Sequence, residues 1–179
     1  MKTLILLRHA KSGWDDPVER DFDRPLNAKG KRAAAIMGRH ARGLGMIFDH
    51  VVASPALRVG QTLDHFERGY GTLAAPDRDR RIYLASSATL LELVRELSDA
   101  YDHVLLVGHN PGLEDLILAL IPDDADEPLR IAVEQKFPTA SMVELAFDVD
   151  HWADLIAGGG HLERFVRPRD VDASLGPDR

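Results

Sequence analysis

Four nitrogen-bearing side chains stand where an apolar run of the sequence gives way to a polar loop. They are Arg8, His9, Arg58 and His109. The runs before them, 4–7, 49–53 and 103–107, are short and rich in aliphatic or β-branched residues, as buried strands of a parallel sheet are. Parallel strands end together at the sheet edge where ligands bind, so we expect these four side chains to meet there.

This set of side chains favours an anion such as phosphate. Arginine presents a planar fork of donors, and Arg58 is expected in the first turn of a helix, where unpaired backbone N–H groups also face an anion. A neutral histidine between arginines stays deprotonated, so it can attack phosphorus and carry the phosphoryl group. Arg8 and His9 alone would also suit a surface arginine and a capping histidine. The three junctions together predict a phosphate pocket.

The elements that must position these side chains alternate along the chain, which predicts an α/β fold. Apolar residues at three- and four-residue spacing predict a helix over 27–44. Ser54 and Asn110 are each followed by proline, so we expect each to cap a helix whose first position is that proline. Segment 81–84 is expected to be a short strand or irregular.

The C-terminal third of the chain is expected to form one edge of the sheet. Residues 141–147 alternate as a strand does, and 161–166 are expected to form an edge strand. The acidic connection 122–128 is expected to be a solvated loop. We expect one domain over 1–167, followed by a flexible tail over 168–179.

Composition limits the partners. The chain has 179 residues and a formal charge of −7, which argues against nucleic acid or an anionic membrane surface as the main partner. With no cysteine, disulfides, thiol nucleophiles and thiolate metal sites are excluded. The apolar run 4–7 is too short for a signal peptide, and no run approaches a membrane span. We expect a cytoplasmic monomer.

Neither a cofactor nor a metal is called for by the motifs. The sequence has no glycine-rich nucleotide fingerprint, and its histidines lack the short His/carboxylate spacing of a zinc helix. We therefore expect side chains alone to supply the chemistry.

Ordered blocks of the sequence resemble the histidine phosphatase (phosphoglycerate mutase-like) superfamily. Arg8-His9-Ala10 resembles its Arg-His-Gly signature. Residues 54–58 with Gln61-Thr62 resemble its second block, and Gly108-His109-Asn110 resembles its third. Residues 21–26, followed by Lys29-Gly30, are similar to the small SixA-type phosphohistidine phosphatases. The resemblance spans 3–167.

The resemblance implies both the fold and the roles of the site residues. It implies a three-layer α/β/α sandwich on a mostly parallel sheet with an antiparallel edge strand. His9 would be the phosphorylated nucleophile. Arg8, Arg58 and His109 would form the phosphate pocket. Alanine at position 10 replaces the usual glycine, as a small-residue variant.

The general acid is the second departure from the family pattern. Larger relatives use a glutamate after the second helix, and the counterpart segment 81–84 contains none. Our candidate is Asp21, which matches a family aspartate in the loop after the first strand, with Asp15 second. Either carboxylate would also suit a solvated or capping role. A phosphoramidate leaving group, whose nitrogen is protonated, needs no strong acid.

The expected substrate follows from an open pocket. The fifty residues between Arg58 and His109 are too few for the helical lid of larger relatives. The resemblance implies phosphohistidine on a partner protein as the substrate. The alternatives are a small-molecule phosphomonoesterase, a non-catalytic phosphate-binding module in which His9 is only a donor, and a mutase. The missing lid and glutamate argue against the mutase.

Overall fold

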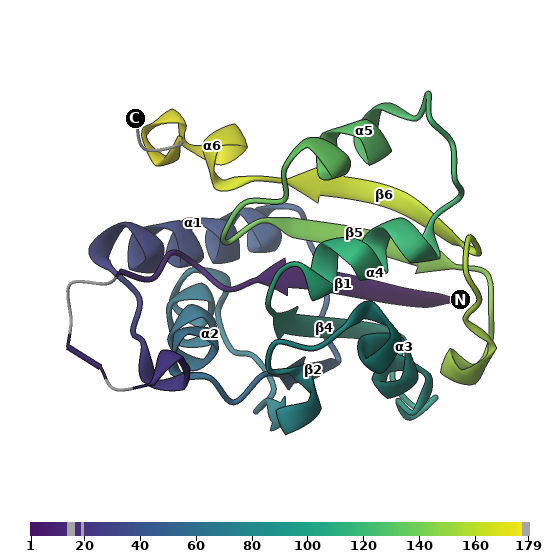
Figure 1. Cartoon of the computed structure of the whole chain (residues 1–179), viewed down its shortest axis with the longest axis horizontal. Coiled ribbons are helices and arrows are strands. Elements are labelled where there is room, and N and C mark those ends of the chain that lie inside the picture. The colour runs from purple at the N-terminus through teal and green to yellow at the C-terminus, as the bar shows by residue number, and fades with distance from the viewer. Residues whose placement is uncertain (14–16, 19, 177–179) are drawn as a thin grey trace.

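The computed structural model of the protein describes residues 1–13, 17–18 and 20–176 (Figure 1). The strands of the described chain are β1 (Lys2–Arg8), β2 (His50–Ala53), β3 (Asp77–Arg78), β4 (His103–Gly108), β5 (Met142–Phe147) and β6 (Gly160–Val166). Its α-helices are α1 (Ala28–Gly43), α2 (Leu57–Tyr70), α3 (Ser87–Arg95), α4 (Gly112–Leu120), α5 (Pro128–Gln135) and α6 (Pro168–Val171). Short 3-10 helices lie at Asp21–Asp23, Arg80–Ile82, Trp152–Asp154 and Ala173–Leu175.

The described strands form one mixed sheet in the order β3-β2-β4-β1-β5-β6. β1 pairs in parallel with β4, β4 with β2, and β2 with β3. β5 pairs antiparallel with both β1 and β6, so antiparallel pairing lies at this edge, as expected. The strand that runs against the others is β5, one position in from the edge. β1 and β4 lie at the centre and end side by side, with Arg8 in register with Gly108.

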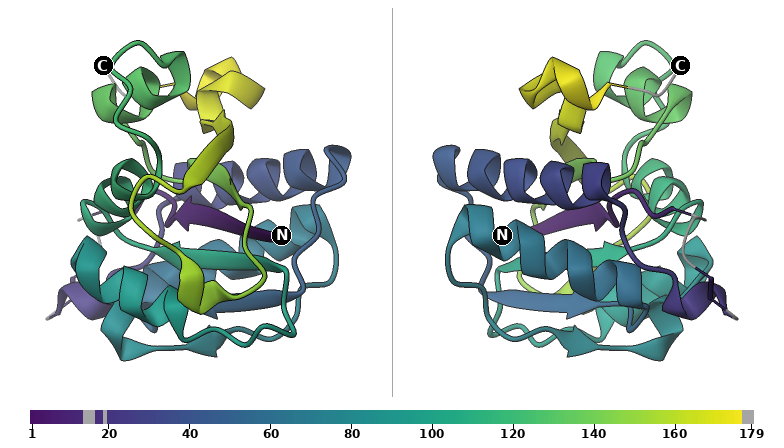
Figure 2. Two further views of the ribbon diagram at one scale, coloured as in Figure 1. Left: turned by 90° about the vertical axis from the view of Figure 1, so that its right-hand side faces the viewer. Right: turned by 90° about the vertical axis from the view of Figure 1, so that its left-hand side faces the viewer.

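Helices cover both faces of the sheet, which confirms the three-layer α/β/α sandwich (Figure 2). α1 and α2 lie on one face, and α3 and α4 lie on the other. The aliphatic run of β1 serves both layers: Leu4 and Leu6 pack with α3 and α4, while Ile5 and Leu7 pack with α1 and α2. A strand buried on both faces needs a continuous aliphatic run, because successive side chains point to opposite faces.

Two predicted helix starts were wrong in detail. α2 begins at Leu57 with Ala56 at its N-cap, and α4 begins at Gly112 with Pro111 at its N-cap. Ser54 lies in the turn before α2, where its Oγ accepts a hydrogen bond from the Ala56 N–H at 3.2 Å. Asn110 lies before α4 and accepts from the Glu114 N–H at 3.3 Å. Both polar side chains therefore support the turn that precedes the helix.

The chain after β6 folds back over the start of α1. Residues 168–176, within the expected flexible tail, form α6 and a 3-10 helix whose Leu175 is buried. The Lys29 Nζ donates a hydrogen bond to the Gly176 carbonyl at 2.7 Å, which joins this segment to α1. The domain boundary at 167 stays a prediction. Among the described residues no helix is long and apolar enough to cross a membrane.

Candidate active site

His9 follows β1 directly and lies at the carboxyl end of the sheet. Its backbone N–H donates to the Gly108 carbonyl at 3.0 Å, which continues the pairing of β1 with β4. The ring is buried, with 7% of the residue exposed. Its Nδ1 lies 2.7 Å from the Ala10 carbonyl oxygen. Because a carbonyl only accepts, Nδ1 carries the proton of the neutral ring, and Nε2 keeps its lone pair.

The residue whose carbonyl orients His9, Ala10, is itself held by α2 through its backbone N–H. The Ala10 N–H donates to the Thr62 Oγ1 at 2.9 Å, and that hydroxyl donates to the Arg58 carbonyl at 2.7 Å. Thr62 is fully buried. A single threonine therefore anchors the backbone N–H of Ala10, the residue whose carbonyl selects the His9 tautomer, as outer partners of functional histidines commonly do.

Arg58 and His109 form the second side of the pocket. The Arg58 Nη2 lies 3.3 Å from the His109 Nδ1, and a guanidinium only donates, so this Nδ1 accepts. The His109 Nε2 then carries the proton and donates to the Ser54 Oγ at 2.8 Å. The rings of His9 and His109 lie with their centroids 5.3 Å apart. The structure thus brings both predicted histidines and Arg58 together.

Arg8 completes the cationic side of the pocket. Its Nη1 donates to the Phe137 carbonyl at 2.9 Å, and the Asn110 side-chain amide donates to the same oxygen at 3.2 Å. Within the described chain, the Nε atoms of Arg8 and Arg58 are buried without a hydrogen-bond partner. Unpartnered buried donors are costly unless a ligand satisfies them, so these two nitrogens indicate an anion site.

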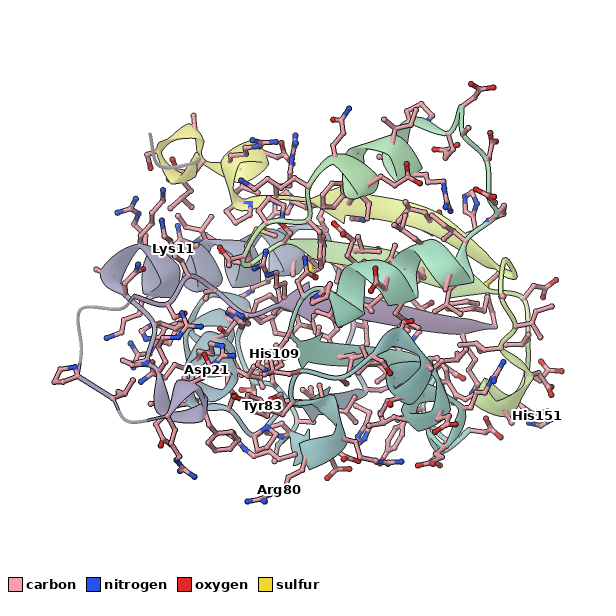
Figure 3. All side chains as sticks on the ribbon, in the orientation of Figure 1. Lys11, Asp21, Arg80, Tyr83, His109 and His151 are labelled. Carbon is pink, nitrogen blue, oxygen red and sulfur yellow. The ribbon has the colours of Figure 1, made fainter. Side chains whose placement is uncertain are left out.

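Asp21 also lies in the pocket, as an anchored carboxylate (Figure 3). Its Oδ2 accepts from the Arg58 Nη2 at 2.9 Å and from the Tyr83 hydroxyl at 2.7 Å. The Arg24 Nη2 donates to its Oδ1 at 3.1 Å, and the other Arg24 terminal nitrogen bonds to Ser12.

These contacts determine the charge of Asp21. Desolvation raises the pKa of Asp21, but the hydrogen bond from Tyr83 and the charge of Arg58 outweigh it and lower the pKa to about 2. An ionised carboxylate has no proton to give near pH 7, so this charge state does not favour Asp21 as the general acid, and that role stays a prediction. Asp15, the second candidate, lies outside the described residues.

Burial keeps both histidines neutral. Loss of solvation lowers the pKa of His9 to about 3; the bond to the Ala10 carbonyl opposes this, and the positive charges of Arg58 and Arg8 add to it. Burial likewise lowers the pKa of His109 to about 4, with the charge of Arg58 adding to the effect. A neutral His9 with its lone pair on Nε2 is the form that can act as a nucleophile.

Stability is expected to fall as the pH falls from 6.5 toward 4. The unfolded chain binds protons on both histidines in this window and the folded chain does not, so the free energy of unfolding decreases by about 1.4 kcal/mol per pH unit for each histidine. Urea unfolding at several pH values measures this slope. The His9→Asn variant is expected to show a slope smaller by one histidine's share. Equal slopes in variant and wild type would contradict the buried neutral state of His9.

The cavity between these groups has a volume of about 350 Å³. Its lining includes all five predicted site residues, Arg8, His9, Asp21, Arg58 and His109. Sequence reasoning missed the roles of Ser54, Thr62 and Tyr83. Ser54 and Thr62 stand within the second motif block, which is the signal that could have indicated them. Tyr83 had no such signal, because its contacts with Asp21 and His109 are long-range.

Metal binding has no support in the described part of the chain. No group of three or more His, Cys, Asp or Glu side chains there is arranged to hold an ion. The absence of a metal requirement stays a prediction.

Comparisons with known proteins agree with this geometry. The model of the histidine phosphatase superfamily (branch 1) matches residues 4–82. An uncharacterized protein of Mycobacterium tuberculosis is 34% identical over 165 residues, covering 91% of this chain and all of its own.

Two solved structures are similar over almost their full length. One, assigned as the phosphohistidine phosphatase SixA of Agrobacterium tumefaciens, is 31% identical with a TM-score of 0.77 and covers 93% of this chain and 98% of its own. Its counterpart from Nakamurella multipartitia is 28% identical with a TM-score of 0.80, covering 93% and 96%. With the pocket described above, these likenesses show that the chain belongs to the histidine phosphatase superfamily and is a phosphatase of the SixA type.

Proposed function

We propose that this protein hydrolyses the P–N bond of phosphohistidine on a partner protein, through a phosphoryl group carried on the His9 Nε2. The observation that supports this best is the combination of a neutral, oriented His9 with an ionised Asp21. Asp21 is the one carboxylate among the described lining residues of the pocket. Among the described residues, the site therefore offers a nucleophile but no carboxylic acid to protonate a leaving group.

Phosphohistidine suits such a site because its leaving group needs no proton from the enzyme. An imidazole ring titrates near neutral pH, so a phosphohistidine ring carries its own proton on the second nitrogen. In the first step the His9 Nε2 forms a bond to phosphorus, the P–N bond of the substrate breaks, and its imidazole leaves in the neutral form. His9 is then a phosphorylated imidazolium. An ester would instead leave as an alkoxide, which requires an acid.

The second step returns the enzyme to its starting form. Water attacks phosphorus, the bond from phosphorus to the His9 Nε2 breaks, and phosphate leaves as the monoanion. His9 becomes a neutral imidazole that keeps its proton on Nδ1, toward the Ala10 carbonyl. No proton has to be stored elsewhere in the pocket.

The remaining pocket residues would stabilise the transferring group. The buried Nε atoms of Arg8 and Arg58 have no hydrogen-bond partner among the described residues, and phosphate oxygens would accept hydrogen bonds from them. A phosphate dianion beside His109 would also raise the pKa of that imidazole, so it would favour the charged, doubly donating ring. This places positive charge where the equatorial oxygens gain negative charge.

A protein substrate is favoured by the accessible rim of the site. Leu84 lines the pocket and is 58% exposed, so the rim presents an apolar side chain to the outside. The Agrobacterium relative is assigned as a phosphohistidine phosphatase. Both observations support a phosphate that is presented on a protein surface.

We expect the purified protein to prefer phosphohistidine over a phosphate ester. A histidine-containing phosphotransfer domain, phosphorylated with phosphoramidate, serves as one substrate, and a phosphoserine peptide as the other. Because a general acid contributes roughly 10²- to 10⁴-fold to ester cleavage, kcat/KM is expected to be at least about 10²-fold higher for the phosphohistidine protein. Released phosphate is measured for both.

Two outcomes would contradict the proposal in different ways. Efficient turnover of the phosphoserine peptide, with none of the phosphohistidine protein, would indicate a phosphomonoesterase. Binding of the phosphohistidine protein without release of phosphate would indicate a binding module.

A further inference from the structure

A second hollow opens beside the phosphate pocket and is lined by basic side chains. Its volume is about 360 Å³, and it shares Arg8, Lys11 and Thr139 with the pocket of His9. The basic residues that line it are Arg8, Lys11, Lys29, Lys136, Arg167 and Arg169. No acidic residue lines it among the described residues. We call this hollow the basic groove.

The basic groove is assembled from segments that are far apart in the sequence. Lys11 follows β1, Lys29 lies in the first turn of α1, Lys136 follows α5, and Arg169 lies in α6. Figure 1 shows α6 beside the start of α1, and Figure 3 shows Lys11 on the side of Asp21 that faces α6. Clustering along one helix does not explain this convergence, because four segments that are separate in the sequence contribute.

The walls of the basic groove are held in place. The Arg167 guanidinium donates to the Asp170 carboxylate at 2.8 and 2.9 Å, which fixes the start of α6. The hydrogen bond from Lys29 to the Gly176 carbonyl holds the following segment. Pro138 and the buried Leu175 add apolar surface to the lining. The result is a groove with cationic walls and apolar surface, which suits an extended acidic peptide.

The positive charge of the basic groove contrasts with the net negative charge of the whole chain. The protein carries a formal charge of −7, so its net charge repels a polyanion such as nucleic acid. A short acidic stretch, seated only in the basic groove, escapes that repulsion. Residues on one side of a phosphohistidine in the pocket of His9 would reach the basic groove across the shared rim at Lys11 and Thr139.

We propose that the basic groove binds an acidic segment of the phosphohistidine-bearing partner, next to the phosphorylated residue. This inference rests on the proposed function and adds the chemistry by which the partner is chosen. Opposite charge across a contact mainly accelerates association and excludes partners of the wrong sign. The groove therefore selects partners with carboxylates beside the phosphohistidine, while the pocket performs the reaction.

The test reverses two charges of the groove that lie outside the pocket of His9. Lys136 is exposed and Arg169 is partly exposed, and neither lines that pocket. The variant K136E/R169E is compared with R39E/R42E, which changes the net charge equally at exposed positions toward the far end of α1. Substrates are a phosphohistidine phosphotransfer domain with an acidic surface and the free amino acid phosphohistidine. Thermal unfolding verifies that both variants are folded.

We expect K136E/R169E to lower kcat/KM for the protein substrate at least about ten-fold, through KM, because it removes electrostatic attraction. Its turnover of free phosphohistidine and its kcat are expected to match wild type. R39E/R42E is expected to behave as wild type on both substrates. Added salt is expected to lower kcat/KM of wild type for the protein substrate, and to lower that of K136E/R169E by a smaller factor.

The outcomes separate this proposal from the proposed function. If wild type dephosphorylates the protein and K136E/R169E does so equally well, the groove proposal is wrong and the proposed function stands. An equal loss in K136E/R169E and R39E/R42E would also overturn it, since net charge alone would then explain the effect. If wild type does not dephosphorylate the protein at all, both fail.

Discussion

Replacing His9 by asparagine is expected to abolish phosphate release, with kcat lowered on the order of 10⁴-fold or more. Asparagine offers an amide N–H to the Ala10 carbonyl, so the local hydrogen bond that holds the native ring can be kept. It has no counterpart of the His9 Nε2 lone pair, so the bond to phosphorus cannot form. Single-turnover release of phosphate from a phosphohistidine protein measures the loss.

The same experiment distinguishes a covalent intermediate from simple binding. Intact-mass measurement soon after mixing is expected to show a transient, acid-labile phosphoryl adduct on wild type and none on His9→Asn. His109→Asn is the matched control, because it removes the neighbouring imidazole but keeps the nucleophile. It is expected to form the adduct more slowly. An adduct of undiminished amount on His9→Asn would assign the phosphoryl group to another residue and overturn this mechanism.

The central strands β1 and β4 were predictable because their local sequence pattern agrees with their buried position in the fold. The run 4–7 is uniformly aliphatic, and β1 is buried on both faces by the two helical layers. Segment 103–107 is also rich in aliphatic residues, and it lies in β4, which is buried in the same way. Where both faces of a strand are buried, the sequence has little freedom, and the residues that follow such strands are fixed in space. Arg8, His9 and His109 were predictable for this reason.

The surroundings of the site were less predictable because they depend on contacts between distant segments. Ser54 followed by proline is a common helix start, yet its hydroxyl lies against His109 and α2 begins three residues later. Tyr83 belongs to a segment with ambiguous local preference, and its hydroxyl bonds to Asp21, sixty-two positions away. Tertiary contacts override local propensity at such positions.

Helices near the C-terminal end illustrate a weaker local signal. α5 starts at Pro128, and the Glu127 side chain accepts a hydrogen bond from the Leu129 N–H. This start signal is hard to recognise in the sequence because Glu127 belongs to a run of acidic residues. α6 is only one turn long, and its capping contacts between Arg167 and Asp170 hold it. Short helices depend on packing and caps more than on periodicity. The basic groove, which needs both segments, was therefore beyond sequence reasoning.

Replacing Arg58 by lysine is expected to lower kcat/KM about 10³-fold while the charge of the site is kept. The Arg58 guanidinium is 2% exposed and donates to the Asp21 carbonyl at 2.8 Å and to the Asp21 carboxylate at 2.9 Å. Its buried Nε remains for a phosphate oxygen. A lysine ammonium is a compact point charge without a planar fork, so it cannot reproduce the spaced donors that the guanidinium directs at Asp21 and at phosphate. Turnover of a phosphohistidine protein measures the loss, and thermal unfolding verifies the fold.

The variant Asp21→Asn then tests whether the Asp21 carboxylate only holds Arg58 or also donates a proton. If Asp21 only holds Arg58, the amide still accepts a hydrogen bond from the guanidinium, and kcat is expected to fall less than about ten-fold. If Asp21 were the proton donor, kcat would fall roughly 10²- to 10⁴-fold. Tyr83→Phe is the matched control, because it removes only the hydroxyl that bonds to Asp21. A large loss in Asp21→Asn with none in Tyr83→Phe would return the acid role to Asp21. Small losses in both would exclude Asp21 as the acid and agree with a phosphohistidine ring that leaves with its own proton.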